Sequence, residues 1–301
     1  MIYTEAQAPG SDPGEPLVNQ DNWQDLPPYN PADPVAKIVR ENLHQMARLG
    51  GIEPVAHLPA PYSLAAEIYG QEFLIVALTE QPELVTGLLD MIVERVLVPW
   101  CADLVATVPD VWLEFSDASG SPMFIGPERF LEFAVKPVRK IIADNPWGDR
   151  VFVANYRGDL PAGAKTRGRR KRGASSSMSF EIMLEAKKQC CPNFLTRLEA
   201  DAAALTRYSD TAIELGMSLY VGIGAVRLDR NSVPDIPAAI TEIRQDTAIR
   251  TREILRVSRA GAPRNTLPWP GDIYVEDTNL HTQPDLFNAV LNGVKDGNAG
   301  A

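Results

Sequence analysis

Residues 111–130 read VWLEFSDASGSPMFIGPERF, and three patterns follow one another within them. An apolar run comes first and is typical of a buried strand. A loop of small residues follows, and Pro127 then suits the first turn of a helix. A strand that leads through a loop into a helix predicts one unit of a parallel sheet with a crossover helix.

The same order recurs along the chain in both directions. Strands are also predicted in residues 53–58, 149–155 and 218–224, and helices in residues 35–50, 81–105, 127–145, 234–258 and 284–294. Residues 179–215 are predicted to be mostly helical, and the stretch between 258 and 284 to be a loop rich in Pro and Trp. The alternation of strand and helix predicts an α/β fold.

A (β/α)8 barrel is favoured over an open, doubly wound sheet. The reason is that unusual residues gather in the loops after the strands, where barrel enzymes keep their active sites. These loops are residues 61–63, 116–117, 155–157 and 222–224.

Composition excludes several classes of protein. The chain has 301 residues, of which 45% are apolar and 23% charged, so it can bury a full core and is neither collagen-like nor wholly disordered. Its net charge of −10 repels nucleic acid. The first 30 residues lack a signal-peptide pattern, and no apolar run is long enough to span a membrane. Three cysteines, two of them adjacent, indicate free thiols in a reducing compartment, so we expect a cytoplasmic protein.

Residues 160–178 stand apart from the rest because they contain KTRGRRKRG at 165–173. This basic, Gly-rich stretch is predicted to be a flexible surface insertion. It has no interleaved aromatic residues on which bases could stack, so nucleic-acid binding is not expected there. A lid over an anionic substrate and an anion-binding adaptor are the functional alternatives.

Three segments, taken in order, resemble the uroporphyrinogen decarboxylase superfamily. PVAHLPAPYSLAAEIYG at 54–70 is similar to that family's strand and Gly/Ala-Pro-Phe/Trp-Thr-Leu segment. VWLEFSDASGSPMFIGPERFLEFAVKPVRKII at 111–142 is similar to its Asp-containing strand, Gly-Ser-Pro loop and following helix. MSLYVGIGAVRLDRNSVPDIPAAI at 217–240 is similar to its Gly-Asn-x-Asp-Pro strand end.

The resemblance implies a tetrapyrrole-type (β/α)8 barrel and one of two activities. One branch of the superfamily decarboxylates the acetate side chains of uroporphyrinogen without a cofactor. The other branch passes methyl groups between a corrinoid and a thiol or other acceptor, in some members with zinc held by a His-x-Cys motif and a later Cys. The implied domains are an extended N-terminal loop at 1–34, a barrel domain at 35–296, and the insertion at 160–178 within it.

The chain departs from the family at several positions. It lacks the family's first strands and the arginines of its N-terminal segment, and the interpretation is a gene model that starts late. Glu67 stands where the decarboxylase has a tyrosine. Asn155, Tyr156 and Arg157 stand where the zinc branch has His-x-Cys, so no metal site is expected. The element at 222–226 lacks the polar groups of the family motif.

Three residues are the predicted catalytic groups. Asp117 follows an apolar strand, where a carboxylate can hydrogen-bond pyrrole N–H groups or orient a base, although a turn or capping role is the alternative. Glu67 is a candidate proton donor if apolar surroundings raise its pKa, and otherwise a solvated or capping helix residue. Tyr62 occupies the aromatic position before Ser63.

Five residues are the predicted substrate-binding groups. Arg157 suits a substrate with several carboxylates, although it could instead pair with Asp159. Asn155 offers an amide beside it. The remaining candidates, which lie at or near the ends of the first two predicted strands, are Ser63, Ser116 and His57.

The leading function predicted from the sequence is decarboxylation of uroporphyrinogen-type acetate groups, which needs no cofactor. The first alternative is a corrinoid-dependent methyltransferase without the zinc site, and the second is a non-catalytic or truncated partner subunit. The expected partners are a small tetrapyrrole or a methyl donor and acceptor, a corrinoid protein in the methyltransferase case, and a second copy in a homodimer. Neither a membrane nor a nucleic acid is expected.

Overall fold

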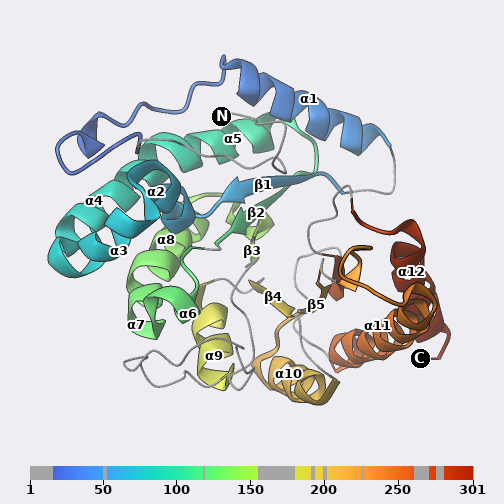
Figure 1. Cartoon of the computed structure of the whole chain (residues 1–301). Helices are drawn as coiled ribbons and strands as arrows, with labels where there is room; N and C mark the ends of the chain where they lie inside the picture. Colours follow the sequence, from blue (N-terminus) through green and yellow to red (C-terminus); the bar gives the residue numbers. More distant parts are fainter. Residues whose placement is uncertain are drawn as a thin grey trace. The chain divides into compact units, whose positions relative to one another are not determined.

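The structure is a computed structural model of the chain. It describes residues 16–49, 53–117, 119–154, 180–190, 194–198, 202–224, 227–260, 271–275 and 281–300. The chain divides into two compact units. The first unit comprises Met1–Gly158 with Gln189–Pro192, and the second comprises Asp159–Lys188 with Asn193–Ala301 (Figure 1).

Three parallel strands form the sheet of the first unit: β1 (Val55–Pro59), β2 (Trp112–Ser116) and β3 (Val151–Ala154). His57 pairs with Glu114 in the β1–β2 register, and Pro59 pairs with Ser116 at the carboxyl ends. Each of the three overlaps a stretch predicted to be a strand, and β1 extends one residue beyond its predicted stretch, to Pro59. Each parallel pair needs a helical crossover, which accounts for the helices between the strands.

Several helices of this unit begin with proline at the first turn, as the sequence predicts for residues 81–105 and 127–145. Proline is favoured there because its missing N–H has no partner in that turn anyway. The helices are α1 (Pro34–Arg48), α2 (Pro61–Tyr69), α3 (Gln71–Glu80), α4 (Pro82–Ile92), α5 (Val98–Thr107), α6 (Pro122–Ile125), α7 (Pro127–Arg129) and α8 (Lys136–Asp144). The unit also has two short 3-10 helices, η1 (Trp23–Asp25) and η4 (Gly148–Arg150).

Two π-helical turns interrupt the long helices just before an internal proline. They are η2 (Val93–Leu97), which joins α4 to α5 ahead of Pro99, and η3 (Phe130–Val135), which joins α7 to α8 ahead of Pro137. Pro99 cannot donate to the carbonyl of Arg95, its partner in a regular α-helix. The N–H of Tyr29 donates to that carbonyl instead, at 2.8 Å. The carbonyl that Pro99 leaves without a helical partner thus anchors the N-terminal segment.

The described residues of the second unit form three parallel strands and four helices. The strands are β4 (Phe194–Leu198), β5 (Leu219–Ile223) and β6 (Gly271–Val275). The helices are α9 (Phe180–Cys190), most of which belongs to this unit, α10 (Ala202–Leu215), α11 (Ile236–Arg259) and α12 (Pro284–Ala299). One core cluster joins β5 to the helices through Ile223, Leu228, Ile243, Leu286, Ala289 and Val290, all at most 2% exposed.

Two strands correct the sequence prediction. β4 lies within residues 179–215, which were predicted to be mostly helical, and β6 lies in the stretch predicted to be a loop. Both are short, and a short apolar run has too few residues for its period to distinguish a strand from a helix. Pairing with β5 in the folded chain makes both segments strands.

The α/β class with parallel strands is confirmed in each unit. The eight-stranded barrel remains a prediction. None of the described helices is long and apolar enough to cross a membrane. The predicted basic insertion at 160–178 lies outside the described residues.

Candidate functional site

The carboxyl ends of β1 and β2 meet at one edge of the first sheet. The N–H of Ala60 donates to the carbonyl of Ser116 at 2.8 Å, which holds the two strand ends together. Helix α2 begins immediately afterwards at Pro61, so Tyr62 and Ser63 lie in its first turn. Asp117 directly follows β2. The structure thus places four predicted site residues at this edge: Tyr62, Ser63, Ser116 and Asp117.

Ser63 and Asp117 are bonded to each other although 54 positions separate them. The Ser63 hydroxyl donates to Asp117 Oδ1 at 2.8 Å and accepts from the N–H of Ser119 at 3.2 Å. The N–H of Gly120 donates to the same carboxylate oxygen at 2.8 Å. Both side chains are buried, at 6% and 4% exposure. This network locks the loop after β2 onto the start of α2.

Position 120 must be glycine in this arrangement because there is no room for a side chain. A Cβ atom there would lie 2.5 Å from Asp117 Oδ1, inside the contact distance of real side chains. Asp117 therefore has the turn role that the sequence left as an alternative. Because its carboxylate is also fixed and buried at the strand edge, the turn role does not exclude a role in chemistry.

Tyr62 is the largest buried polar group near this edge. Its ring is 1% exposed, and its hydroxyl has no hydrogen-bond partner among the described residues. Burial raises the pKa of the Tyr62 hydroxyl, and the negative charge of Asp117 raises it further, while Arg129 opposes the shift. The phenol is therefore held protonated, as a hydrogen-bond donor without an acceptor. A buried donor of this kind costs free energy unless a ligand or water satisfies it.

His57 and Glu114 form a second polar pair on the same two strands. His57 Nδ1 lies 2.8 Å from Glu114 Oε2, and the two residues are direct partners in the strand register. The imidazole side chain is 63% exposed and the carboxylate 3%. His57 was predicted as a site residue. Glu114 was missed, although a charged residue inside the apolar run 111–116 is a signal that could have identified it.

Glu67 lies one helical turn beyond Ser63 on α2 and is exposed there. Partial desolvation raises the pKa of its carboxyl above the ordinary value, which is the direction expected of a proton donor. No hydrogen bond in the described part of the chain joins it to Ser63 or Asp117, so the structure does not bring it into their network. Asn155 and Arg157 lie outside the described residues.

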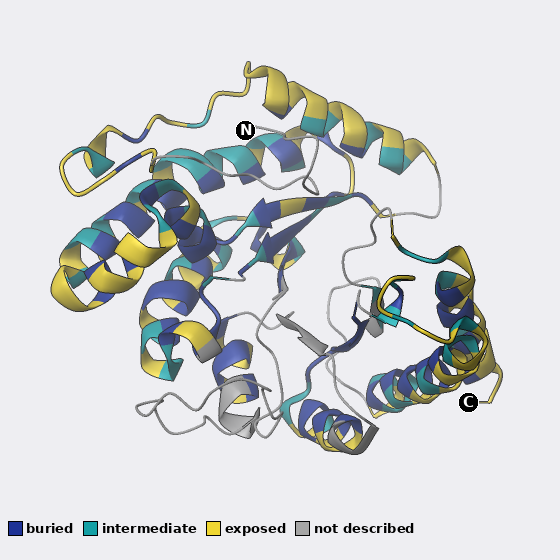
Figure 2. Ribbon diagram, in the orientation of Figure 1, coloured by how far each residue is buried: buried dark blue, intermediate teal, exposed yellow. Residues whose placement is uncertain are grey.

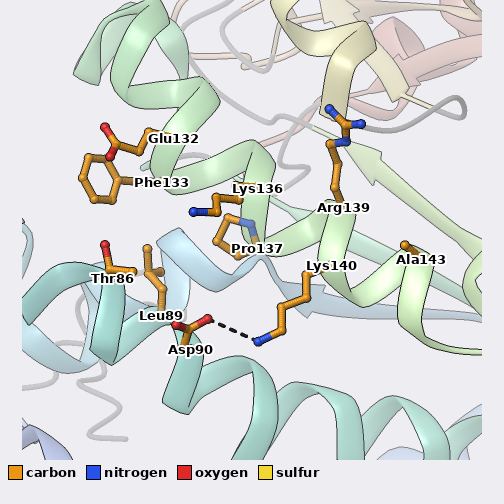
Figure 3. Close-up of a pocket in the computed structure, with 10 residues that line it drawn as sticks. All are labelled: Thr86, Leu89, Asp90, Glu132, Phe133, Lys136, Pro137, Arg139, Lys140 and Ala143. Carbon is orange, nitrogen blue, oxygen red and sulfur yellow. Dashed lines mark hydrogen bonds and ion pairs between the residues drawn. The ribbon is translucent and has the colours of Figure 1, made fainter. Parts of the chain in front are cut away.

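A groove on the helical layer of the first unit is a separate feature (Figure 3). It encloses about 410 Å³ between α4 and the η3–α8 helix, and it contains none of the predicted site residues. Lys140 in this groove is paired with Asp90 at 3.4 Å and Glu94 at 2.8 Å. The groove therefore combines charges of both signs on exposed helices, and nothing in it favours chemistry over the strand edge.

Metal ligands do not gather in the described part of the chain. Among those residues, no group of three or more His, Cys, Asp or Glu side chains is placed to hold a metal ion. Cys101 is fully buried in α5, and burial raises the pKa of its thiol, so it is held as an inert core group.

Comparisons with known proteins give a likeness of structure and none of sequence. The chain matches no protein-family model and no curated protein sequence. Among solved structures, it is similar to a methyltransferase from Methanosarcina mazei, with 10% sequence identity and a TM-score of 0.58. The match covers 86% of this chain, which spans only 64% of the length of that structure. At this identity the likeness shows a shared fold.

Proposed function

We propose that the chain is a methyltransferase that acts on a small molecule. The observation that carries the proposal is the likeness of fold to a methyltransferase over 86% of the chain. The three sequence segments that resemble the uroporphyrinogen decarboxylase superfamily support it, because one branch of that superfamily transfers methyl groups. Membership of that superfamily and a (β/α)8-type fold are parts of the same proposal.

Methyl transfer replaces acetate decarboxylation as the leading function. The reason is that the structural neighbour is named as a methyltransferase. Decarboxylation therefore becomes an outcome of the test.

The methyl acceptor would bind at the carboxyl edge of β1 and β2. Asp117 offers a fixed carboxylate there, and Ser63 holds it in place at 2.8 Å, so no reorganisation is needed when the acceptor binds. Tyr62 offers a buried hydroxyl donor that an acceptor could satisfy. Interactions of this kind act more strongly at buried sites than in bulk water.

A corrinoid is the methyl carrier that the resemblance implies. The contacts among the described residues do not locate a site for it, so the proposed mechanism includes no step on a corrinoid. We assign the strand edge to the acceptor because Ser63 holds Asp117 in a fixed position there.

The test is a methyl-transfer assay on the full chain. Methylcobalamin serves as donor, homocysteine and 2-mercaptoethanol serve as acceptors, and mass spectrometry follows the S-methyl product. Wild-type protein is expected to form product. Asp117→Asn, which removes the fixed charge, is expected to be slower by a factor of about 10 or more.

Asp144→Asn is the matched control, since Asp144 is exposed at the end of α8, and it is expected to retain the full rate. Carbon dioxide release from uroporphyrinogen without any methyl transfer would contradict the proposal and restore the decarboxylase interpretation.

A further inference from the structure

We propose that His57 and Glu114 are a proton-transfer pair that activates the methyl acceptor, an inference that rests on the proposed methyltransferase function. In this pair His57 is the base that touches the acceptor, and Glu114 is a positioning residue that acts through the imidazole. Glu114 was not among the residues that the sequence predicted for the site.

The pair is built into the sheet. His57 and Glu114 are opposite each other in adjacent parallel strands, with Nδ1 and Oε2 separated by 2.8 Å. Side chains two positions apart in a strand share a face, so the pair faces the same side as Pro59 and Ser116 at the carboxyl edge. Along the strands, the distance from His57 and Glu114 to Pro59 and Ser116 is about 7 Å, which a side chain and a small acceptor can bridge.

Exposure differs sharply between the two members. The Glu114 side chain is 3% exposed, while that of His57 is 63% exposed. A carboxylate inside a strand costs free energy that an apolar residue would not, and buried ion pairs seldom repay that cost in stability. Ionisable groups kept in such positions often serve function.

The short distance between Nδ1 and Oε2 determines which imidazole nitrogen acts in the proposed pair. A carboxylate only accepts hydrogen bonds, so the neutral imidazole of this pair carries its proton on Nδ1, on the side of Glu114. Nε2 is then the proton acceptor. A carboxylate that fixes the tautomer of a histidine base is the arrangement by which enzymes orient general bases.

In the proposed step, the S–H bond of a thiol acceptor breaks, and its proton passes to His57 Nε2. The sulfur forms a bond to the methyl carbon, and the bond from that carbon to the donor breaks, with its electron pair leaving on the donor. Glu114 stabilises the imidazolium that forms, because its negative charge is 2.8 Å from Nδ1.

The two other histidines serve as internal controls. His44 lies on α1 and lines a cavity with Pro54 and Pro109, which precede β1 and β2, so it belongs to the amino ends of the strands. His281 lies in the second unit. Three histidines in all make each imidazole separately assignable by ¹⁵N NMR.

The first arm of the experiment needs no substrate. ¹⁵N spectra of the full chain are recorded at a pH of about 8, where an ordinary imidazole is neutral. Wild-type His57 is expected as the Nδ1–H tautomer. Glu114→Ala is expected to shift it towards Nε2–H, and Glu114→Gln, which keeps an acceptor oxygen, is expected to restore Nδ1–H. An Nε2–H tautomer in the wild type would overturn the pair whatever the activity.

The second arm measures methyl transfer from methylcobalamin to homocysteine. Loss of the base in His57→Gln is expected to lower the rate about 10²–10⁴-fold, the usual contribution of general acid–base catalysis, and Glu114→Gln to lower it about tenfold or more. His57 is exposed, so its variant tests the base even if Glu114→Ala fails to fold. His44→Gln is expected to retain the wild-type rate.

The two proposals fail in different ways. An active wild type with equally active His57→Gln and Glu114→Gln variants would overturn the proton-transfer pair and leave the methyltransferase function standing. An inactive wild type would overturn that function, and the role of the pair in methyl transfer with it.

Discussion

The two faces of the first sheet differ in composition. One face carries Ala56, Leu58, Leu113, Phe115, Val151 and Val153, all at most 3% exposed. The opposite face is mixed: it carries His57 and Glu114, with Ser116 at its carboxyl edge, beside the apolar Trp112 and Phe152. The strands of this unit are largely buried in Figure 2, yet only one of their faces is wholly apolar.

Under the proposed function, one short sheet separates stability from chemistry. Alternation along a strand sends successive side chains to opposite faces. The apolar face gains the free energy of burial, and the other face bears the cost of a buried carboxylate and a polar edge. Functional substitutions should therefore change activity without unfolding the protein, and core substitutions should do the reverse.

The largest effect is expected on the apolar face. Phe115→Ala removes a fully buried ring from β2 and should lower the free energy of unfolding by about 3–5 kcal/mol, because the cavity cannot collapse completely. Chemical denaturation measures it. His57→Gln on the other face is the control and should cost no more than about 1–2 kcal/mol, because it loses only one contact with the Glu114 carboxylate. Equal losses of unfolding free energy in the two variants would contradict the proposed difference between the two faces.

The next effect is expected at the turn after β2. In Gly120→Ala, the new Cβ overlaps the carboxylate that Ser63 and the Gly120 N–H hold in place. We expect a loss of up to about 3 kcal/mol by thermal unfolding, together with slower methyl transfer as Asp117 moves. Gly300→Ala, where the nearest atom would be 3.5 Å away, should be neutral. A Gly120→Ala variant with the stability and methyl-transfer rate of the wild type would mean that the loop rearranges at little cost in free energy.

A smaller effect is expected from Ser63→Ala. This variant removes one hydrogen bond to a buried carboxylate and should cost about 1–2 kcal/mol. Ser119→Ala is the matched control, since Ser119 joins the network through its backbone N–H. Denaturation of the two variants side by side measures the side-chain contribution alone, and equal values for both would assign no stability to the Ser63–Asp117 bond.

The smallest effect is expected at Glu67. Because desolvation raises its folded-state pKa, the ionised carboxylate destabilises the fold above that pKa, and the penalty vanishes below the unfolded value of 4.5. Glu67→Gln should therefore stabilise the protein at neutral pH, by less than about 1 kcal/mol because the group is exposed, and have no effect in acid. A stability gain that persists in acid would contradict this assignment.

Much of the fold could be predicted from sequence because its signals are local. The apolar run 111–116 and the prolines at helix starts are readable without knowledge of the partners. β4 and β6 could not be predicted, because their identity depends on pairing with β5. A short run carries too little periodicity to show such pairing in advance.

The proximity of the candidate site residues was predictable in part for the same reason. Tyr62, Ser63 and Asp117 each stand next to a strand end or helix start. The Ser63–Asp117 bond, by contrast, joins positions 54 residues apart, and the His57–Glu114 pair depends on strand register. Neither is encoded in a local pattern. Glu114 in particular looks like a strand residue until its partner across the sheet is known.

The most direct test of this account measures two quantities on one variant, His57→Gln. The account predicts that methyl transfer from methylcobalamin falls at least about 100-fold, while the free energy of unfolding falls by no more than about 1–2 kcal/mol, the cost of one contact with the buried Glu114 carboxylate. A wild-type rate in that variant would contradict the assignment of chemistry to the face that carries His57 and Glu114. A rate that falls only as far as stability falls would contradict the separation of the two faces.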